Sequence, residues 1–552
     1  MILDFLIFFI VYYIAFLSTY SYGKYFHNFL FVNNKEEKIN HNEYIYLFYG
    51  VSFCILFSWL YYFSFGLKNE WLNLFFILFG FIIFCLDQNK TKKILFYFLP
   101  MFLFLGIIIY NNHNDFHLYH YQNIAELTDS YPKIGLGNLN AKYVYASIYT
   151  YFEAVFNFPV YKHHFFNIPR FLLLVSICGY LLFNVVNRND NLKQFLSAVF
   201  LIFILIKFKR FSEYGYDYLV TFLIMFIFVE YFYKIKKKTY SLKNIFFLFA
   251  ISVSVKLTAL FFLPFIIYVI YRNFFFNQKF SFFLKEITPA CLVALIFLSN
   301  SFLNSGCVLY PIKKTCFKND HVSWSVNYDE ILIEQNVTKK WAKAYYHQKN
   351  NKISSYEEYA NNGKWLLNWF YSHFFDKIFE PILIFLSLVL IFYILCRSEK
   401  YKSKECCNFL LPCIASLFFW FISLPQLRFG YFYILLIIFL LTSFFLKKDI
   451  NFGKKTELFI ILAFIFFNIH NGKRIHKEFN DNKNFPWYEI VNFKTKQTIL
   501  GNFTYTQFLR DDKNSKLQHS QNDTNFKYNL VFNDKNITLN KKNNFLFIKK
   551  ND

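Results

Sequence analysis

Charged residues are scarce in this sequence, and glycine and proline are scarce too. Asp, Glu, Lys and Arg make up 17% of the 552 residues, against about 25% in an average soluble protein. With only 15 Gly and 11 Pro, a collagen-like chain is excluded, and 56% hydrophobic residues exclude a disordered one. Ten Cys are present, but none has the CxxC spacing of a zinc or redox site.

Long apolar runs occupy much of the chain, and crossing a bilayer as a helix takes about 20 such residues. Fourteen candidate runs fall at 3–20, 43–65, 70–86, 93–110, 164–186, 191–207, 216–234, 244–256, 257–272, 284–302, 376–396, 408–425, 429–446 and 456–470. The runs at 244–256 and 257–272 are short enough to form one bent segment instead. The pattern predicts an all-α polytopic membrane protein with about 14 transmembrane helices.

The basic residues that give the chain its formal charge of +24 are distributed as this topology predicts. Lys and Arg cluster in alternate loops, at 87–93, 233–244, 397–405 and 447–457. Because basic residues are retained in cytoplasmic loops, these four loops are predicted to be cytoplasmic, and no nucleic-acid partner is needed to explain the charge. The N-terminus has neither a basic segment nor a small-residue cleavage site, so we expect no cleaved signal peptide.

The opposite, external side then receives two long loops and the polar C-terminal tail. The predicted organisation is 1–110, N-terminal transmembrane helices; 111–163, an external loop with interfacial helices; 164–302, a transmembrane core; 303–375, a second external loop; 376–470, C-terminal transmembrane helices; and 471–552, a polar external tail or small domain. Cys307 and Cys316 share the second loop, where a disulfide and unpaired thiols are both compatible with the sequence.

The first external loop opens on Asp115, His117 and His120. One interpretation makes Asp115 the N-cap of an interfacial helix and the histidines ordinary surface residues. The other makes Asp115 a general base that deprotonates an acceptor hydroxyl at the membrane face. In that case the D-x-H-x-x-H spacing could supply part of a divalent metal site.

Several charged residues lie at span ends on the external side, against the expected bias. Arg210, Lys256 and Arg428 are the main cations, and Asp217 lies beside them in the predicted topology. Placing an unpaired charge at the end of a membrane span costs a few kcal/mol of free energy, so each such residue is a candidate functional residue. These cations could bind the phosphate of a lipid carrier. Snorkelling to the interface, or ion pairs with Glu213 and Asp217, would explain them equally.

Four short motifs occur along the chain in an order that resembles a group of known proteins. They read DFHLYHYQNI at 115–124, GLGNL at 135–139, GCVLYP at 306–311 and PQLRFG at 425–430. The chain resembles an uncharacterised group of bacterial polytopic membrane proteins with these features, a group similar in layout to GT-C-type glycosyltransferases. The sequence departs from the GT-C pattern because three extra spans precede the acidic loop and Phe116 replaces a second acidic residue after Asp115.

The resemblance implies a GT-C-like fold and a role for each matched residue. Asp115 would be the catalytic base, Arg428 a late basic residue near the lipid phosphate, and Asp217 a second acidic position. The implied function is transfer of a sugar from a polyprenyl-phosphate carrier at the periplasmic face of the bacterial inner membrane, in cell-surface glycan assembly. The alternative is a transporter or flippase for a lipid-linked oligosaccharide, which needs the cations but no base.

Overall fold

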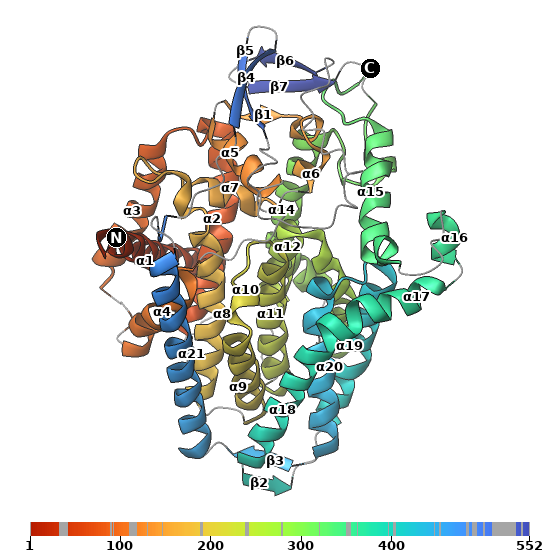
Figure 1. Ribbon diagram of the computed structural model, residues 1–552. Helices are drawn as coiled ribbons and strands as arrows, with labels where there is room; N and C mark the ends of the chain where they lie inside the picture. The colour runs from red at the N-terminus through yellow and green to blue at the C-terminus, as the bar shows by residue number, and fades with distance from the viewer. Residues whose placement is uncertain are drawn as a thin grey trace.

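The fold was analysed in a computed structural model. It describes residues 2–31, 42–88, 91, 93–109, 119–129, 131–145, 147–187, 191–237, 242–277, 280–318, 321–348, 355–361, 363–395, 397–400, 404–446, 448–451, 454–481, 485–487, 494–500, 503–509, 537–542 and 545–550. Most of these residues are helical (Figure 1).

Each predicted span coincides with a helix. The long helices are α1 Ile2–Phe31, α2 Glu43–Phe65, α3 Glu70–Leu86, α4 Ile94–Ile107, α8 Ile168–Val186, α9 Asn191–Ile206, α11 Asp217–Lys237, α12 Leu242–Val255, α13 Leu263–Asn277, α14 Phe280–Ser305, α18 Glu380–Leu395, α19 Lys404–Ser423, α20 Leu427–Leu446 and α21 Lys454–Asp481. Among the described residues, five helices are long and apolar enough to cross a membrane, in α1, α2, α8, α14 and α21. The protein is therefore a helical membrane protein, while the figure of fourteen crossings stays a prediction.

Helices α1 and α2 pack backbone to backbone. Asn42 caps α2 by accepting a hydrogen bond from the Tyr44 N–H, and Gly66 ends the helix with a positive φ of 76°, which favours glycine. A Cβ atom added to Gly50 would lie 1.9 Å from the carbonyl oxygen of Thr19, and one added to Gly23 would lie 1.7 Å from that of Tyr46. Small residues at these two positions therefore permit the close approach of the helices.

The two ends of the bundle carry different strands (Figure 1). At one end, β2 Arg397–Lys400 pairs antiparallel with β3 Lys448–Asn451, so two of the predicted cytoplasmic loops lie side by side. At the other end, β1 Lys133–Ile134 of the first long loop pairs in parallel with β7 Phe545–Lys550, which pairs with β6 Ile537–Lys542. The tail and the first long loop consequently share one end of the molecule, which also carries the hairpin of β4 Lys494–Leu500 and β5 Phe503–Leu509.

The first long loop is folded into the bundle. Its helices are α5 Tyr121–Asp129, α6 Ala141–Val144 and α7 Tyr149–Ala154. Every residue of α7 is buried, and so is almost all of α5. Helix α7 packs against α2 and α8, and α5 packs against α7. The prediction that helices of this loop lie on the membrane surface is therefore wrong for α5 and α7, because both are buried inside the protein.

The chain breaks its helical course at Lys256. Helix α12 ends at Val255, Lys256 is extended (φ −161°, ψ 134°), and the 3-10 helix η5 Leu257–Phe262 leads into α13. Phe261 contacts Phe419, whereas Tyr268 contacts Phe409, so α13 runs antiparallel to α19. Helix α12 covers only about 21 Å at 1.5 Å per residue, short of the roughly 30 Å hydrocarbon layer. Two short helices therefore meet at Lys256, as the separate runs at 244–256 and 257–272 predict.

Shorter helices connect these elements. They are η3 Leu136–Asn138, η4 His163–Phe165, α10 Phe208–Phe211, η6 Lys313–Thr315, α15 Tyr328–Ala342, η7 Tyr345–His347, α16 Tyr356–Asn361, α17 Lys364–Trp369 and the π-helix η8 Phe370–Phe379.

Candidate anion site at the rim of the helix bundle

Asp217 is the meeting point of two cations that are far apart in the sequence. It begins α11 and its side chain is 7% exposed. The Lys256 ammonium group donates to one carboxylate oxygen of Asp217, and the Nε of Arg428 lies 3.3 Å from the other. Since Lys256 stands at the break after α12 and Arg428 in the first turn of α20, three separate helices supply one ion-pair group.

Aromatic rings and the second long loop enclose the same group. The Arg428 guanidinium lies 4.7 Å from the centroid of the Trp341 ring on α15, and the Lys256 ammonium lies 4.8 Å from that of Phe429. The side-chain amide of Gln426 donates to the Trp341 carbonyl at 3.0 Å. Cation–π contacts of this kind hold the two cations in place while leaving them charged.

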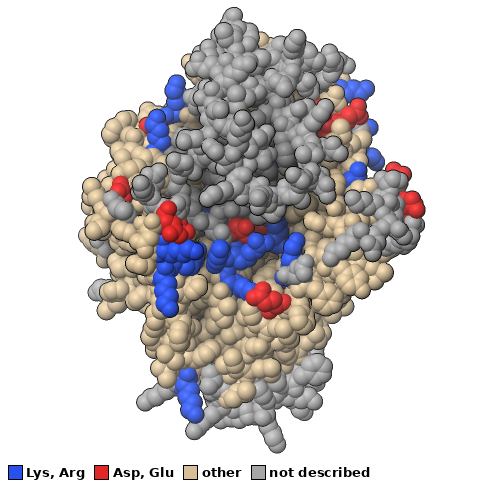
Figure 2. All heavy atoms as spheres, viewed as in Figure 1, with Lys and Arg blue, Asp and Glu red and all other residues tan. Residues whose placement is uncertain are grey.

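Further cations extend the group along α10. Arg210 pairs with Glu213 at 2.6 Å, and Lys207 pairs with Glu380 at 2.6 Å. Arg210 also interacts electrostatically with Arg428. We call the following set the outer charge cluster: Lys207, Lys209, Arg210, Glu213, Asp217, Lys256, Glu380 and Arg428. Its five cations exceed its three carboxylates, and Figure 2 shows Lys and Arg side chains gathered across the middle of this face, at the level of α10 in Figure 1.

Ion pairs with Glu213 and Asp217 were one of the explanations that the sequence left open for the external cations, and the structure contains them. Arg210 pairs with Glu213, while Lys256 and Arg428 pair with Asp217. The ion pairs therefore fix the positions of these cations at the ends of separate helices.

His120 links the outer charge cluster to a second polar group. Its side chain is buried, which makes the interpretation as a surface histidine wrong. The imidazole ring lies 4.8 Å from the ring of Tyr216 and 5.4 Å from that of Tyr214, and it interacts electrostatically with Asp217. His120 is buried because its ring packs against Tyr214 and Tyr216, in the segment between α10 and α11.

Glu153 is the centre of this second group, and the sequence analysis missed it. It lies in α7, it is 1% exposed, and its Oε2 accepts hydrogen bonds from the hydroxyls of Tyr214 at 2.8 Å and Tyr216 at 3.0 Å. Arg170, buried in the first turn of α8, lies 4.9 Å from the Tyr214 ring. The sequence signal that could have identified Glu153 is its position as the single carboxylate in the apolar stretch YTYFEAVF. Such a residue must have partners if it is buried, because ionisable residues are almost never fully buried without them.

Asp115 and His117 lie outside the described residues. Of the three residues in the D-x-H-x-x-H motif, the structure therefore places only His120. Among the residues it describes, no group of three His, Cys, Asp or Glu side chains is arranged to hold a metal ion.

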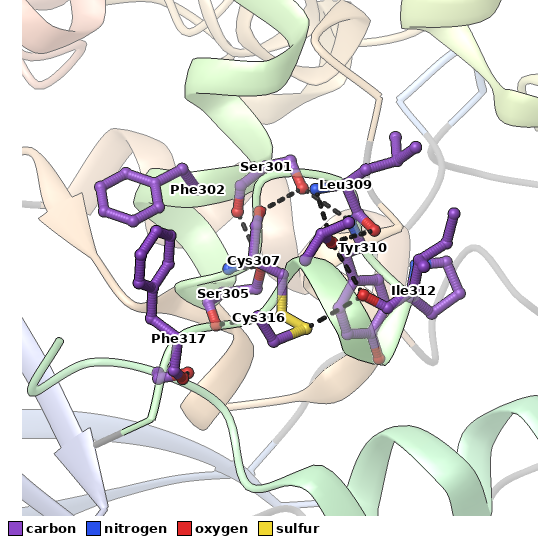
Figure 3. The surroundings of a disulfide bond; sticks show 12 residues. Ser301, Phe302, Ser305, Cys307, Leu309, Tyr310, Ile312, Cys316 and Phe317 are labelled. Atoms are coloured by element: carbon purple, nitrogen blue, oxygen red, sulfur yellow. Dashed lines mark hydrogen bonds between the residues drawn. A yellow bond between two sulfur atoms is a disulfide. The ribbon is translucent and has the colours of Figure 1, made fainter. Parts of the chain in front are cut away.

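A disulfide joins Cys307 and Cys316 within the second long loop, which settles the pairing that the sequence left open (Figure 3). The hydroxyl of Ser301 on α14 donates to the Cys307 carbonyl at 2.9 Å and accepts from the Tyr310 N–H at 3.0 Å. The buried Tyr310 ring then packs edge-on against Tyr145 of the first long loop, 4.9 Å away. The disulfide therefore stabilises the part of the second long loop that contacts the first long loop.

Because disulfides persist in oxidising compartments, the bond predicts that this loop is external. In a variant whose other cysteines are replaced by Ala, a membrane-impermeant maleimide applied to intact cells should label Cys316 only after reduction, whereas Cys307 is fully buried. The Cys307→Ser variant should be labelled at Cys316 without reduction. Labelling that requires permeabilised membranes would place the loop in the cytoplasm and contradict the topology.

Comparison with known proteins gives a family but no characterised relative. Neither the curated proteins nor the solved structures include a significant match to this chain. One family model covers residues 5–435, and so spans both long loops and every described member of the outer charge cluster. The chain belongs to the family described as Domain of unknown function (DUF8201).

Proposed function

We propose that this protein is a GT-C-like membrane glycosyltransferase that takes a sugar from a polyprenyl-phosphate carrier at the periplasmic face of the bacterial inner membrane. The observation that carries the proposal is the convergence of Lys256 and Arg428 on Asp217. A lipid-linked phosphate stays at the membrane surface, and a group of fixed cations at the rim of the helix bundle suits such an anion.

Local backbone geometry supports an anionic ligand at the same place. Helices α11 and α20 both begin at the outer charge cluster, so their N-termini point toward it. The N-terminus of a helix carries a partial positive charge and unsatisfied N–H groups, which favour a phosphate. The dipoles and the side-chain cations therefore act in the same direction.

In the proposed reaction, the hydroxyl oxygen of the acceptor attacks the anomeric carbon as the bond from that carbon to the phosphate oxygen breaks. The phosphate leaves with the bonding electron pair, and Lys256 and Arg428 stabilise the charge that develops on it. Asp115 takes the proton of the acceptor hydroxyl. This role for Asp115 is carried over from the sequence motif.

The proposal is tested with purified protein in lipid nanodiscs and a polyprenyl-phosphate-linked sugar. We expect Lys256→Met and Arg428→Met each to lower the rate of sugar release by about 100-fold, since removing one charged hydrogen bond to a developing anion costs roughly 3 kcal/mol. The control is Lys193→Met, which breaks a similarly buried pair with Glu230 (3.0 Å) at the opposite end of the bundle. Equal losses in all three variants would mean that the cations act only through stability.

A second candidate function is transport of a lipid-linked oligosaccharide. The interruption between α12 and α13 at Lys256 favours it, because broken membrane helices often form substrate sites in transporters. The two functions differ in chemistry. A transporter would move a fluorescent lipid-linked sugar between the leaflets of a liposome without releasing the sugar, and Asp115→Asn would leave that movement unchanged.

A further inference from the structure

Glu153 contacts the connection between α10 and α11 through hydrogen bonds. The two tyrosines that donate to its carboxylate, Tyr214 and Tyr216, occupy this connection, and Asp217 follows directly. Gly215 between them has φ of 145°, a conformation that side-chain-bearing residues rarely adopt. Two hydrogen bonds to one buried carboxyl group therefore help to position Asp217, in addition to its ion pairs with Lys256 and Arg428.

The surroundings of Glu153 contain few groups that could hold its charge. Three groups face it directly: Tyr214 and Tyr216 from the α10–α11 connection, and Arg170 from α8. Tyr149 on α7 also interacts with it, and Cys54 of α2 lies beside Tyr149. His120, just before α5, reaches this group through contacts with the two tyrosine rings. The hydroxyl of Tyr216 also lies 2.8 Å from that of Thr150. Arg170 is the one fixed charge among these described groups.

We infer that Glu153 is a positioning residue for the outer charge cluster: it holds Asp217 in place through Tyr214 and Tyr216, and loss of its proton weakens the binding of a phosphate head group. The inference rests on the proposed function, because it concerns regulation of the same site. It adds a residue, and a dependence on pH, that the sequence motifs do not contain.

The expected direction follows from the protonation of Glu153. Burial raises the pKa of its carboxyl group to about 8, although the two tyrosine hydrogen bonds and Arg170 act in the opposite direction. The group is thus neutral at neutral pH and becomes negative above about pH 8. A new negative charge near the cluster repels an anionic ligand. At an effective dielectric constant of about 20, repulsion between two unit charges about 10 Å apart corresponds to about a tenfold change in affinity.

The experiment measures binding of farnesyl phosphate to the full-length protein in nanodiscs between about pH 7 and pH 9.5. Over this range the phosphate stays fully charged, because its second pKa is about 6. We expect the affinity of the wild type to fall about fivefold to tenfold. Glu153→Gln keeps a hydrogen-bond acceptor but cannot ionise, so its affinity should stay constant. Farnesol, which lacks the phosphate, controls for binding of the lipid chain.

A second variant protects the test against loss of folding. Tyr214→Phe keeps the carboxyl group but removes a hydrogen bond that stabilises its charged form, so the fall in affinity should move to higher pH. A wild type that binds farnesyl phosphate equally at all pH values, or a Glu153→Gln variant with the wild-type profile, would overturn the inference and leave the proposed function standing. Failure of the wild type to bind farnesyl phosphate at any pH would instead overturn the head-group site itself.

Discussion

Asp217→Asn is expected to lower the free energy of unfolding by about 3 kcal/mol, because removing one member of a buried ion pair leaves the others without compensation. Asn has nearly the same shape as Asp, so the loss reports charge rather than volume. The side chains of Lys256 and Arg428 are 27% and 21% exposed, which places the expected cost at the lower end of the range for buried pairs. Thermal unfolding of the purified protein in detergent measures the effect.

A double-mutant cycle tests whether the cost comes from this pairing. Asp217→Asn combined with Lys256→Met removes the carboxylate together with one of its cations, so the double variant should be less destabilised than the sum of the two single variants. Additive losses would show that Asp217 and Lys256 are not energetically coupled. An Asp217→Asn variant as stable as the wild type would contradict the pairing seen in the structure.

Gly50→Ala is expected to destabilise the protein by several kcal/mol. The added Cβ would lie 1.9 Å from the Thr19 carbonyl oxygen, and overpacking of a tight interface typically costs about 1–3 kcal/mol or more when backbone has to move. Helices α1 and α2 would have to separate along their contact, because the obstacle is backbone rather than a flexible side chain.

Gly472 in α21 provides the matched control. A Cβ atom at this position meets nothing within 4 Å. Gly472→Ala should therefore stabilise the protein by up to about 1 kcal/mol through its higher helix propensity. Both variants are compared by thermal unfolding under the same conditions. Similar melting temperatures for Gly50→Ala and the wild type would mean that α1 and α2 are not in backbone contact.

The positions of the long helices could be predicted from the sequence because each depends on a local property, an apolar run bounded by polar residues. The break at Lys256 was visible in the same way, as two short runs on either side of a charge. The prediction of helices lying on the membrane surface failed because tertiary packing, and not local sequence, decides where these segments lie. The segment around α7 is apolar enough to lie on a membrane, but the structure buries it between α2 and α8.

The candidate site could be predicted only in part. Lys256, Arg428 and Asp217 are conspicuous because charges at span ends are costly, and the structure brings all three together. Glu153 and Arg170 lie in apolar stretches whose partners come from distant segments, so no local pattern indicates their neighbours. Tyr214 and Tyr216 were equally hidden, since a chain with 43 Tyr gives no reason to select two of them.

The pairing of Lys133 with Leu546 has a consequence for biosynthesis. A ribosome adding about 5–20 residues per second makes β1 tens of seconds before β7 exists. During that interval the Asn138 side chain lacks one of its acceptors, the Ile548 carbonyl, and the fold above the helices stays open. The β1–β7 pairing is therefore a late event during synthesis of the chain, and a ribosome that stalls between α21 and β7 would leave the helices without this strand pairing.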